Sequence, residues 1–299
     1  MTSTANGTAH HEGDPGISWP VGRGSHDSRP NPLGQINAGG IGRAPEFSSL
    51  PTVSDETRSR LEKQYLPGQP KSLSGIATRA FLLGFILSAS VISAFYLVIF
   101  TNSPLWRLPA FLATLSLFHF LEFWTTARYN TRSAQISSFL LSQNGSAYNI
   151  AHTAAMLECL LMNLIFPIRS WAPRSISAVP IIAGLVMILV GQGVRSIAMV
   201  QAGTNFNHIV QHRKANEHQL VTTGAYYYLR HPSYFGFFWW GLGTQLVLGN
   251  AVCFLGYAVV LWRFFSRRIS GEEELLVAFF GDEYVQYRKR TGVWIPFIK

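Results

Sequence analysis

Polar and ionisable side chains gather in two stretches of this sequence, which is otherwise mostly apolar beyond residue 75. The first stretch, residues 202–234, ends in Arg230-His-Pro-Ser-Tyr234 and also holds Asn205, Asn207, His208, Gln211, His218 and Tyr226. The second stretch, residues 263–290, holds the bases Arg263, Arg267 and Arg268 and the acids Glu272, Glu273 and Glu274. Ionisable groups among apolar segments are costly to bury and mark functional sites by default, so both stretches are candidate sites.

The first stretch suits an anionic ligand. Gly224 favours a turn, and Pro232 suits the first turn of a helix, where its missing N–H costs nothing. Arg230 and His231 would then lie at the membrane surface beside free backbone N–H groups, a place suited to an anion. The alternative is that Arg230 and His231 are only interfacial anchors. The residues alone leave both interpretations open.

The second stretch could place opposite charges on one helix face. If the preceding apolar segment continues as a helix, Arg268 and Glu272 are neighbours one turn apart. Gly271 interrupts this pattern and makes the continuity of the helix a point to test. The alternative is that the acids begin a helix and Arg288-Lys-Arg290 ends it, so that both groups only complement the helix dipole.

The composition indicates a membrane protein. Hydrophobic residues make up 48% of the 299 residues and charged residues only 13%, whereas soluble domains carry about 25% charged residues. The N-terminal part, up to residue 75, is different, because it holds eight of the 15 prolines and only three aromatic side chains. A single soluble globule is therefore excluded. We expect a disordered cytosolic tail over residues 1–75 and a membrane domain over residues 76–299.

A helix needs about 20 mostly apolar residues to cross a bilayer. Four runs of roughly this length lie at residues 80–100, 108–127, 148–166 and 176–194. The segment from His231 to Trp262 contains no Asp, Glu, Lys or Arg, and Gly249-Asn250 predicts a turn within it. We therefore expect a tight helical hairpin over residues 234–248 and 252–265. A short interfacial or connecting helix is expected over residues 133–141. The predicted fold is an all-α integral membrane protein with about six transmembrane helices, including the C-terminal hairpin.

The basic residues predict the orientation of this fold. They stand singly at the ends of apolar runs, as flanking charges of membrane spans do, and no basic block suggests a nucleic-acid partner. With six spans, the connections after the second and fourth carry most of the arginines, which places both termini in the cytosol. The sequons Asn6-Gly-Thr8 and Asn144-Gly-Ser146 would lie on that side and stay unglycosylated.

Three other patterns have simple structural explanations. Gly191-Gln-Gly193 and Gly241-Leu-Gly243 follow no predicted strand, so close helix packing explains them better than dinucleotide binding. Cys159 and Cys253 lie inside apolar runs and are expected to be small buried side chains. The nine histidines form no metal-binding motif, so we predict no metal site.

Several ordered motifs are similar to the isoprenylcysteine carboxyl methyltransferase family. They are Asn205-Phe-Asn207-His208, His218-Gln-Leu-Val-Thr, Arg230-His-Pro-Ser-Tyr234, Trp262-Arg-Phe-Phe265, Phe279-Phe-Gly-Asp-Glu-Tyr284 and Pro296-Phe-Ile298. The resemblance is dense over residues 195–299, looser over residues 78–170 and absent from residues 1–75. Ala251 departs from the family, which often has proline after the asparagine of the hairpin turn.

The resemblance implies a methyl transfer from S-adenosylmethionine to the C-terminal carboxylate of a prenylated cysteine, at the endoplasmic reticulum membrane with the active site facing the cytosol. The implied protein substrates are CaaX proteins of the small GTPase or pheromone type, and membrane lipid surrounds the enzyme. The catalytic region would cover about residues 195–299. Arg268 would hold the substrate carboxylate as the catalytic residue. The residues implied to bind the cofactor are Gln211, His218, Gln219, Leu220, Val221, Tyr226, His231, Pro232, Ser233, Tyr234 and Glu272.

Elementary chemistry agrees with this implication. A C-terminal carboxylate has a pKa of about 3.3–3.7, so it is ionised at pH 7 and needs no general base. The site must align it with the methyl group and exclude water. A related membrane enzyme, a phospholipid N-methyltransferase or an NADPH-dependent sterol reductase, is the first alternative, and a non-catalytic scaffold or transporter is the second.

Overall fold

The structure is a computed structural model that describes residues 54–101, 103–141, 144–165, 174–211 and 218–298. Its helices are α1 (Asp55–Lys63), α2 (Leu73–Phe100), α3 (Arg107–Tyr129), α4 (Gly145–Ile165), α5 (Arg174–Ala202), α6 (Ala225–Tyr228), α7 (Pro232–Leu248), α8 (Val252–Phe280) and α9 (Asp282–Arg290). Short 3₁₀ turns lie at η2 (Pro104–Trp106), η3 (Thr131–Ser133), η4 (Ile136–Phe139) and η5 (Gly203–Asn205). Over the described residues there is no strand, only a bridge between Leu229 and Gly292, so the all-α prediction is confirmed.

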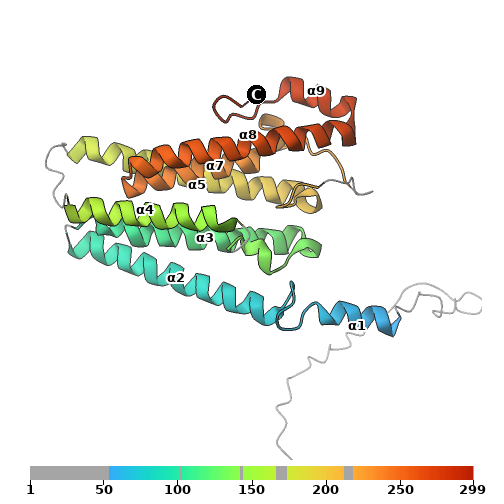
Figure 1. The fold of residues 1–299 in the computed structure, drawn as a ribbon, viewed down its shortest axis with the longest axis horizontal. Coiled ribbons are helices and arrows are strands. Elements are labelled where there is room, and N and C mark those ends of the chain that lie inside the picture. Colours follow the sequence, from blue (N-terminus) through green and yellow to red (C-terminus); the bar gives the residue numbers. More distant parts are fainter. Residues whose placement is uncertain (1–53, 102, 142–143, 166–173, 212–217, 299) are drawn as a thin grey trace, which may run out of the picture. The chain divides into compact units, whose positions relative to one another are not determined.

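The long helices lie side by side, and α3 packs against α2, α4, α5 and α7 (Figure 1). Among the described residues, three helical stretches are long and apolar enough to cross a membrane, namely Leu73–Phe100, Pro104–Tyr129 and Ala178–Asn205. The three other predicted spans also form helices, in α4, α7 and α8. Their crossing of the membrane, and hence the total of six, stays a prediction. The expected connecting helix over residues 133–141 is wrong, because the 3₁₀ turns η3 and η4 take its place.

The last part of the expected tail is helical. Helix α1 begins after Ser54, whose hydroxyl accepts from the N–H of Thr57, and it has acids in its first turn and bases in its last. Ser72 caps α2 in the same way, so the boundary predicted at residue 75 falls inside α2. Residues 1–53, which include the first sequon, lie outside the described residues, and the disorder of that part stays a prediction.

The predicted hairpin is confirmed, and its turn is capped from another helix. Gly249 ends α7 in the left-handed conformation (φ 75°), which glycine adopts without strain. The Glu158 carboxylate on α4 accepts from the N–H groups of Ala251, Val252 and Cys253, at 2.9, 2.9 and 2.7 Å. This carboxylate therefore satisfies the free donors at the N-terminus of α8.

Helix α8 extends beyond the predicted apolar segment 252–265 and includes the acidic cluster Glu272–Glu274. It continues through Gly271 for 29 residues, which corresponds to about 44 Å and exceeds the roughly 30 Å hydrocarbon core. Arg268 and Glu272 lie in the part of α8 that follows the predicted apolar stretch, which ends at residue 265. Helix α9 begins with Asp282 and Glu283 and ends with Arg288-Lys-Arg290, so these bases lie at a helix C-terminus as the dipole interpretation expected. That interpretation is wrong for Glu272–Glu274, because these acids lie within α8 and do not begin a helix.

Glycine pairs bring α5 and α7 into close contact. A Cβ atom added to Gly191 would lie 2.6 Å from the carbonyl oxygen of Gly236, and one added to Gly243 would lie 2.7 Å from that of Gly184. Close packing is thus confirmed for Gly191 and Gly243. Gly193 has open space instead, and so it plays no part in this contact.

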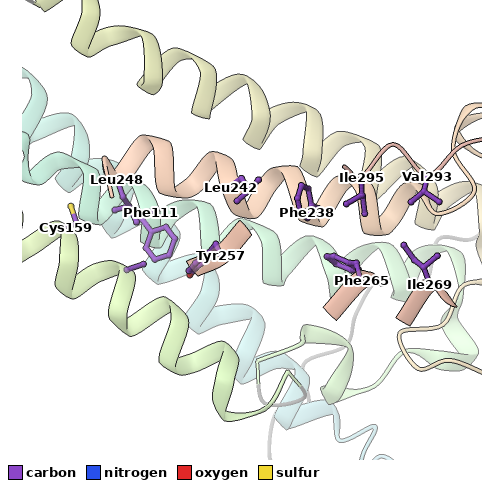
Figure 2. Packing of buried hydrophobic residues seen from close by; sticks show 11 residues of the cluster. Phe111, Cys159, Phe238, Leu242, Leu248, Tyr257, Phe265, Ile269, Val293 and Ile295 are labelled. Carbon is purple, nitrogen blue, oxygen red and sulfur yellow. The ribbon is translucent and has the colours of Figure 1, made fainter. Parts of the chain in front are cut away.

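The C-terminal segment folds back onto the hairpin. Figure 2 shows Val293 and Ile295 beside Phe238, Phe265 and Ile269, all of them buried. The backbone N–H of Arg230 donates to the Gly292 carbonyl at 3.0 Å, and the indole N–H of Trp262 donates to the Pro296 carbonyl at 2.9 Å. These contacts join the segment before α7 to the end of the chain. Cys159 is buried as predicted, and Cys253 is half-buried.

Candidate functional site

A polar pocket lies between the segment before α7 and the C-terminal half of α8. Its walls include all the residues that the sequence assigned to the cofactor except Gln211: His218, Gln219, Leu220, Val221, Tyr226, His231, Pro232, Ser233, Tyr234 and Glu272. Pro232 stands at the first position of α7, as predicted. Two stretches that lie far apart in the sequence thus meet in one place. Whether these residues bind the cofactor stays a prediction.

Tertiary contacts hold the loop that forms one wall of this pocket. The Gln219 N–H donates to Oδ1 of Asn205 at 3.0 Å, and the His218 ring meets the Phe280 ring edge-on with 5.5 Å between centroids. Gly224, with φ 62°, starts α6 and supplies the expected turn. The pocket encloses about 120 Å³, below the roughly 300–1,000 Å³ of small-molecule sites.

A larger apolar cavity lies next to this pocket. It has a volume of about 980 Å³ and is lined mainly by one face of α8 and the N-terminal part of α4, together with the segment 206–211. Arg268 and Gln211 line this cavity and not the polar pocket. Gln211 is exposed, and its Nε2 donates to the Ile209 carbonyl at 2.9 Å. The sequence had grouped Gln211 with residues that lie in the neighbouring pocket.

The Tyr234 hydroxyl connects the two cavities. It accepts from Nε of Arg268 at 2.8 Å and donates to Oε2 of Glu272 at 2.5 Å. Nη2 of Arg268 also donates to the His208 carbonyl at 2.5 Å. Helix α8 is continuous through Gly271, as the prediction that Arg268 and Glu272 are neighbours one turn apart required. The two side chains are connected through the Tyr234 hydroxyl. A guanidinium at the rim of the apolar cavity is thereby linked to a carboxylate in the polar pocket.

Arg230 is buried in an ion pair that the sequence did not indicate, and both interpretations of this residue, as part of an anion site or as an interfacial anchor, stay predictions. Nε of Arg230 donates to Oε1 of Glu273 at 2.8 Å, and Nη1 donates to the carbonyls of Arg288 and Thr291. Nε2 of His231 lies 3.2 Å from the same carboxylate oxygen. The guanidinium thus fastens the segment before α7 to α8 and the C-terminal segment. The partner of Arg230 comes from a distant part of the sequence.

Glu273 is ionised in this arrangement. Burial favours its neutral form, but the hydrogen bonds from His231 and Arg230 and the positive charge of Arg230 outweigh burial and hold the pKa of the carboxyl below its usual value. Burial also raises the pKa of the neighbouring Tyr287 phenol to about 12. This phenol stays neutral and donates to the Tyr226 carbonyl at 2.5 Å. The charged Arg230–Glu273 pair and the neutral Tyr287 hydroxyl therefore stabilise the wall of the polar pocket.

A buried ion pair that the sequence did not indicate lies between the two cavities. Nε and Nη2 of Arg195 donate to the two carboxylate oxygens of Glu122 at 2.5 and 2.7 Å. Nη1 of Arg195 donates to the Ser233 carbonyl at 3.1 Å. The only sequence signal of this ion pair was the position of Glu122 inside an apolar run. Its partner Arg195 could not be identified, because it belongs to α5, much further along the chain.

His208 stands beside this pair and lines the apolar cavity. Its Nδ1 lies 3.6 Å from Oε2 of Glu122. Burial lowers the pKa of His208 to about 4, even though the Glu122 charge acts in the opposite direction. The imidazole is therefore neutral at pH 7, and its contact with Glu122 is not an ion pair at that pH.

Comparison with known proteins gives a consistent result. Residues 184–278 match the model of the isoprenylcysteine carboxyl methyltransferase family. The chain is 41% identical over 238 residues to protein-S-isoprenylcysteine O-methyltransferase of Saccharomyces cerevisiae, covering 79% of this chain and 97% of the relative. It is 40% identical over 225 residues to the protein of the same name from Homo sapiens, covering 75% of each.

A solved structure is similar over most of the chain. The structure of a eukaryotic intramembrane Ras methyltransferase, isoprenylcysteine carboxyl methyltransferase, superimposes with a TM-score of 0.68 at 32% identity. The match covers 81% of this chain and 82% of that one. The similarity therefore extends beyond the motifs of the polar pocket to the arrangement of the helices.

Proposed function

The chain belongs to the isoprenylcysteine carboxyl methyltransferase family, and we propose that it methylates the C-terminal carboxylate of a prenylated cysteine with S-adenosylmethionine as methyl donor. One observation carries the residue assignments. Arg268 stands at the rim of a large apolar cavity and is joined through Tyr234 to Glu272 in a polar pocket. A substrate with a long apolar chain and a carboxylate, and a polar charged cofactor, need such adjoining sites.

The polar pocket has the chemistry that the cofactor requires. When bound, S-adenosylmethionine supplies an electrophilic methyl group on a positively charged sulfur. The Glu272 carboxylate, 28% exposed, is available to the positive groups of the cofactor. Tyrosine rings of the pocket can contact a cation through their faces. The proposed binding set is His218–Val221, Tyr226, His231–Tyr234 and Glu272, whereas Gln211 is better placed to contact the substrate.

Arg268 has the task of orienting the nucleophile. The substrate carboxylate, with a pKa of about 3.3–3.7, is ionised at neutral pH and attacks without loss of a proton. A planar guanidinium can hold a carboxylate through two hydrogen bonds. Nε of Arg268 donates to Tyr234 and Nη2 to the His208 carbonyl, which fixes the plane of the group. Alignment and exclusion of water then supply most of the rate enhancement.

The apolar cavity is the proposed site of the prenyl chain. Its walls of aliphatic and aromatic side chains remove apolar surface from water, which stabilises a bound chain by about 25 cal/mol per Å². We propose that the protein partners are CaaX proteins carrying such a chain, of the small GTPase or pheromone type. Membrane lipid would surround the exposed apolar faces of α2 and α5.

A direct assay tests this function. The purified full chain is incubated with methyl-labelled S-adenosylmethionine and N-acetyl-S-farnesylcysteine, and label released as base-labile methyl ester is counted. We expect ester with this substrate and none with the matching carboxamide, which lacks the nucleophilic carboxylate. Absence of ester from the folded protein would contradict the proposal.

We further propose that the protein lies in the endoplasmic reticulum membrane with both termini and the active site in the cytosol. Asn144, at the start of α4, is the reporter available among the described residues. It should carry no glycan in cells, whereas a sequon engineered into residues 102–104, on the opposite side in this topology, should be glycosylated. A glycan on Asn144 would invert the proposed orientation.

A further inference from the structure

Two hydrogen bonds hold the guanidinium of Arg268. Its Nε donates to the Tyr234 hydroxyl at 2.8 Å, and its Nη2 donates to the His208 carbonyl at 2.5 Å. Tyr234 belongs to the first turn of α7, whereas His208 lies between η5 and α6. The direction of the guanidinium therefore depends on how two separate parts of the chain are held.

The first of these parts is held by Arg195 on α5. Nη1 of Arg195 donates to the carbonyl of Ser233, the residue before Tyr234, at 3.1 Å. The backbone of Arg195 also packs closely on α7, because a Cβ atom added to Gly236 would lie 2.8 Å from the Arg195 nitrogen. Arg195 thus positions the first turn of α7, from which the Tyr234 side chain extends.

The second part is held by α3. Oε2 of Glu122 lies 3.6 Å from Nδ1 of His208, and Oγ1 of Thr126 lies 3.3 Å from Nε2 of the same ring. The Thr126 hydroxyl donates to the Glu122 carbonyl at 2.8 Å. Both ring nitrogens of His208 therefore contact α3, and these contacts position the backbone carbonyl that accepts from Arg268.

Glu122 is common to both paths. Its carboxylate oxygens accept from Nε and Nη2 of Arg195 at 2.5 and 2.7 Å, and Glu122 is fully buried. Removal of one partner of such a pair leaves the other charge buried without compensation, so Arg195 would shift. A change at Glu122 would thus reach Arg268 along both paths, although Glu122 lines neither cavity.

We propose that Glu122 is a positioning residue for methyl transfer, which through its two contacts holds the Arg268 guanidinium in the plane that orients the substrate carboxylate. The inference rests on the proposed function, because Glu122 has this task only if Arg268 holds that carboxylate. Misplacement of a reacting group by about 1 Å can cost about 100-fold in rate. The effect of Glu122 should therefore appear in kcat and should vanish when Arg268 is absent.

A double-mutant cycle tests this role. Full-length wild type, Glu122→Gln, Arg268→Ala and the double variant are assayed with N-acetyl-S-farnesylcysteine, and kcat is measured at saturating substrate and S-adenosylmethionine. We expect Glu122→Gln to lower kcat by about tenfold or more in the wild-type background and by less than about twofold in the Arg268→Ala background.

Glu158→Gln is the matched control. The Glu158 carboxylate also accepts hydrogen bonds from a distant part of the chain, at the start of α8, but it lines neither cavity. This variant removes a carboxylate charge from a structural contact, so it should keep the wild-type kcat.

The outcomes separate this inference from the proposed function. An unchanged kcat in Glu122→Gln, or an equal fall in both backgrounds, would overturn the positioning role while methyl transfer by the wild type stands. If Glu122→Gln does not fold, Thr126→Ala, which removes the hydroxyl beside the His208 ring, enters the same cycle with an expected fall of about threefold. An absent or additive effect of that variant would then overturn the role. Absence of ester from the wild type would instead remove the proposed function.

Discussion

Arg268 and Glu272 lie one helical turn apart on α8, yet each faces a different cavity. The Tyr234 phenol, which comes from α7, receives a hydrogen bond from one and donates to the other. If Arg268 holds the substrate carboxylate, as proposed, this arrangement separates that carboxylate from the charge of Glu272, while a single side chain, that of Tyr234, bridges the two sites. The two residues are thus expected to act on different ligands.

Substitution of these two residues should therefore separate two binding steps. Arg268→Ala should lower methyl transfer by about 100-fold or more through a misplaced nucleophile, with little change in S-adenosylmethionine affinity. Glu272→Ala should instead weaken cofactor binding about tenfold, because a charge-assisted contact is lost. Calorimetry with S-adenosylmethionine and initial rates with the farnesyl substrate measure the two effects. Glu274→Ala, an exposed acid outside both cavities, is the control. Equal loss of cofactor affinity in Arg268→Ala would refute this division.

The Arg230–Glu273 pair should make stability depend on pH. The folded-state pKa of Glu273 is lowered, so its contribution is present above the unfolded-state value of about 4.3 and is lost as pH falls through the folded value. At pH 7, Glu273→Gln should cost about 3–5 kcal/mol, because it leaves the Arg230 charge buried without its partner. Thermal unfolding in detergent at pH 7 and in acid measures this cost. The deficit should shrink in acid, whereas Glu274→Gln should be near neutral at both values. A deficit independent of pH would argue against the pair.

At the scale of elements, the contact between α5 and α7 depends on glycine at matched positions. Gly184 faces Gly243 and Gly191 faces Gly236, so the two backbones touch at two points two helical turns apart. This spacing keeps both points on one helix face. The contact matters for the site, because α5 supplies Arg195 and α7 supplies Ser233 and Tyr234.

Gly243→Leu should disrupt this contact. The added side chain meets the Gly184 carbonyl and Met187, and overpacking of this kind costs about 1–3 kcal/mol or more. Gly193→Leu, on the partner helix where an added Cβ meets nothing, should be tolerated. The melting temperature of the detergent-solubilised protein distinguishes the two variants. Similar melting temperatures for the two variants would show that the close approach of α5 and α7 contributes little to stability.

At the scale of the whole molecule, the described residues that line the two cavities belong to the part of the chain that we expect to lie in the membrane or at its surface. Among the described residues, those that line the two cavities begin at Thr126. Helix α1 has its own cap in Ser54 and no buried residue. The chain before Ser54 is therefore not expected to contribute to the reaction.

Deletion of residues 1–53 should leave turnover within about twofold of the full chain, because the described residues that line the two cavities begin at Thr126. The measurement is kcat/KM with the farnesyl substrate, and the cofactor affinity serves as the control for correct folding. A truncated chain that folds and binds the cofactor but loses methyl transfer would assign the tail a role in catalysis.

Much of the fold could be predicted because its signals are local. The length of the apolar runs, the turn at Gly249-Asn250 and Pro232 at the start of α7 each depend on neighbouring residues. The resemblance assigned His218–Val221 and His231–Tyr234 to the cofactor, and these residues line one polar pocket, although their role in binding stays a prediction. Local spacing also predicted that α8 could bring Arg268 and Glu272 to one face.

Only the tertiary structure decided which distant groups meet. Glu122 pairs with Arg195, Glu158 caps the start of α8, and Arg230 pairs with Glu273. Buried charges and free helix ends must find partners, but periodicity does not say which partner lies nearby. For the same reason the position of Arg268 in the apolar cavity, and the phenol that links it to the polar pocket, depended on how α7 packs against α8. The residues themselves determined a membrane methyltransferase, and packing determined that Arg268 lines the apolar cavity while Glu272 lines the polar pocket.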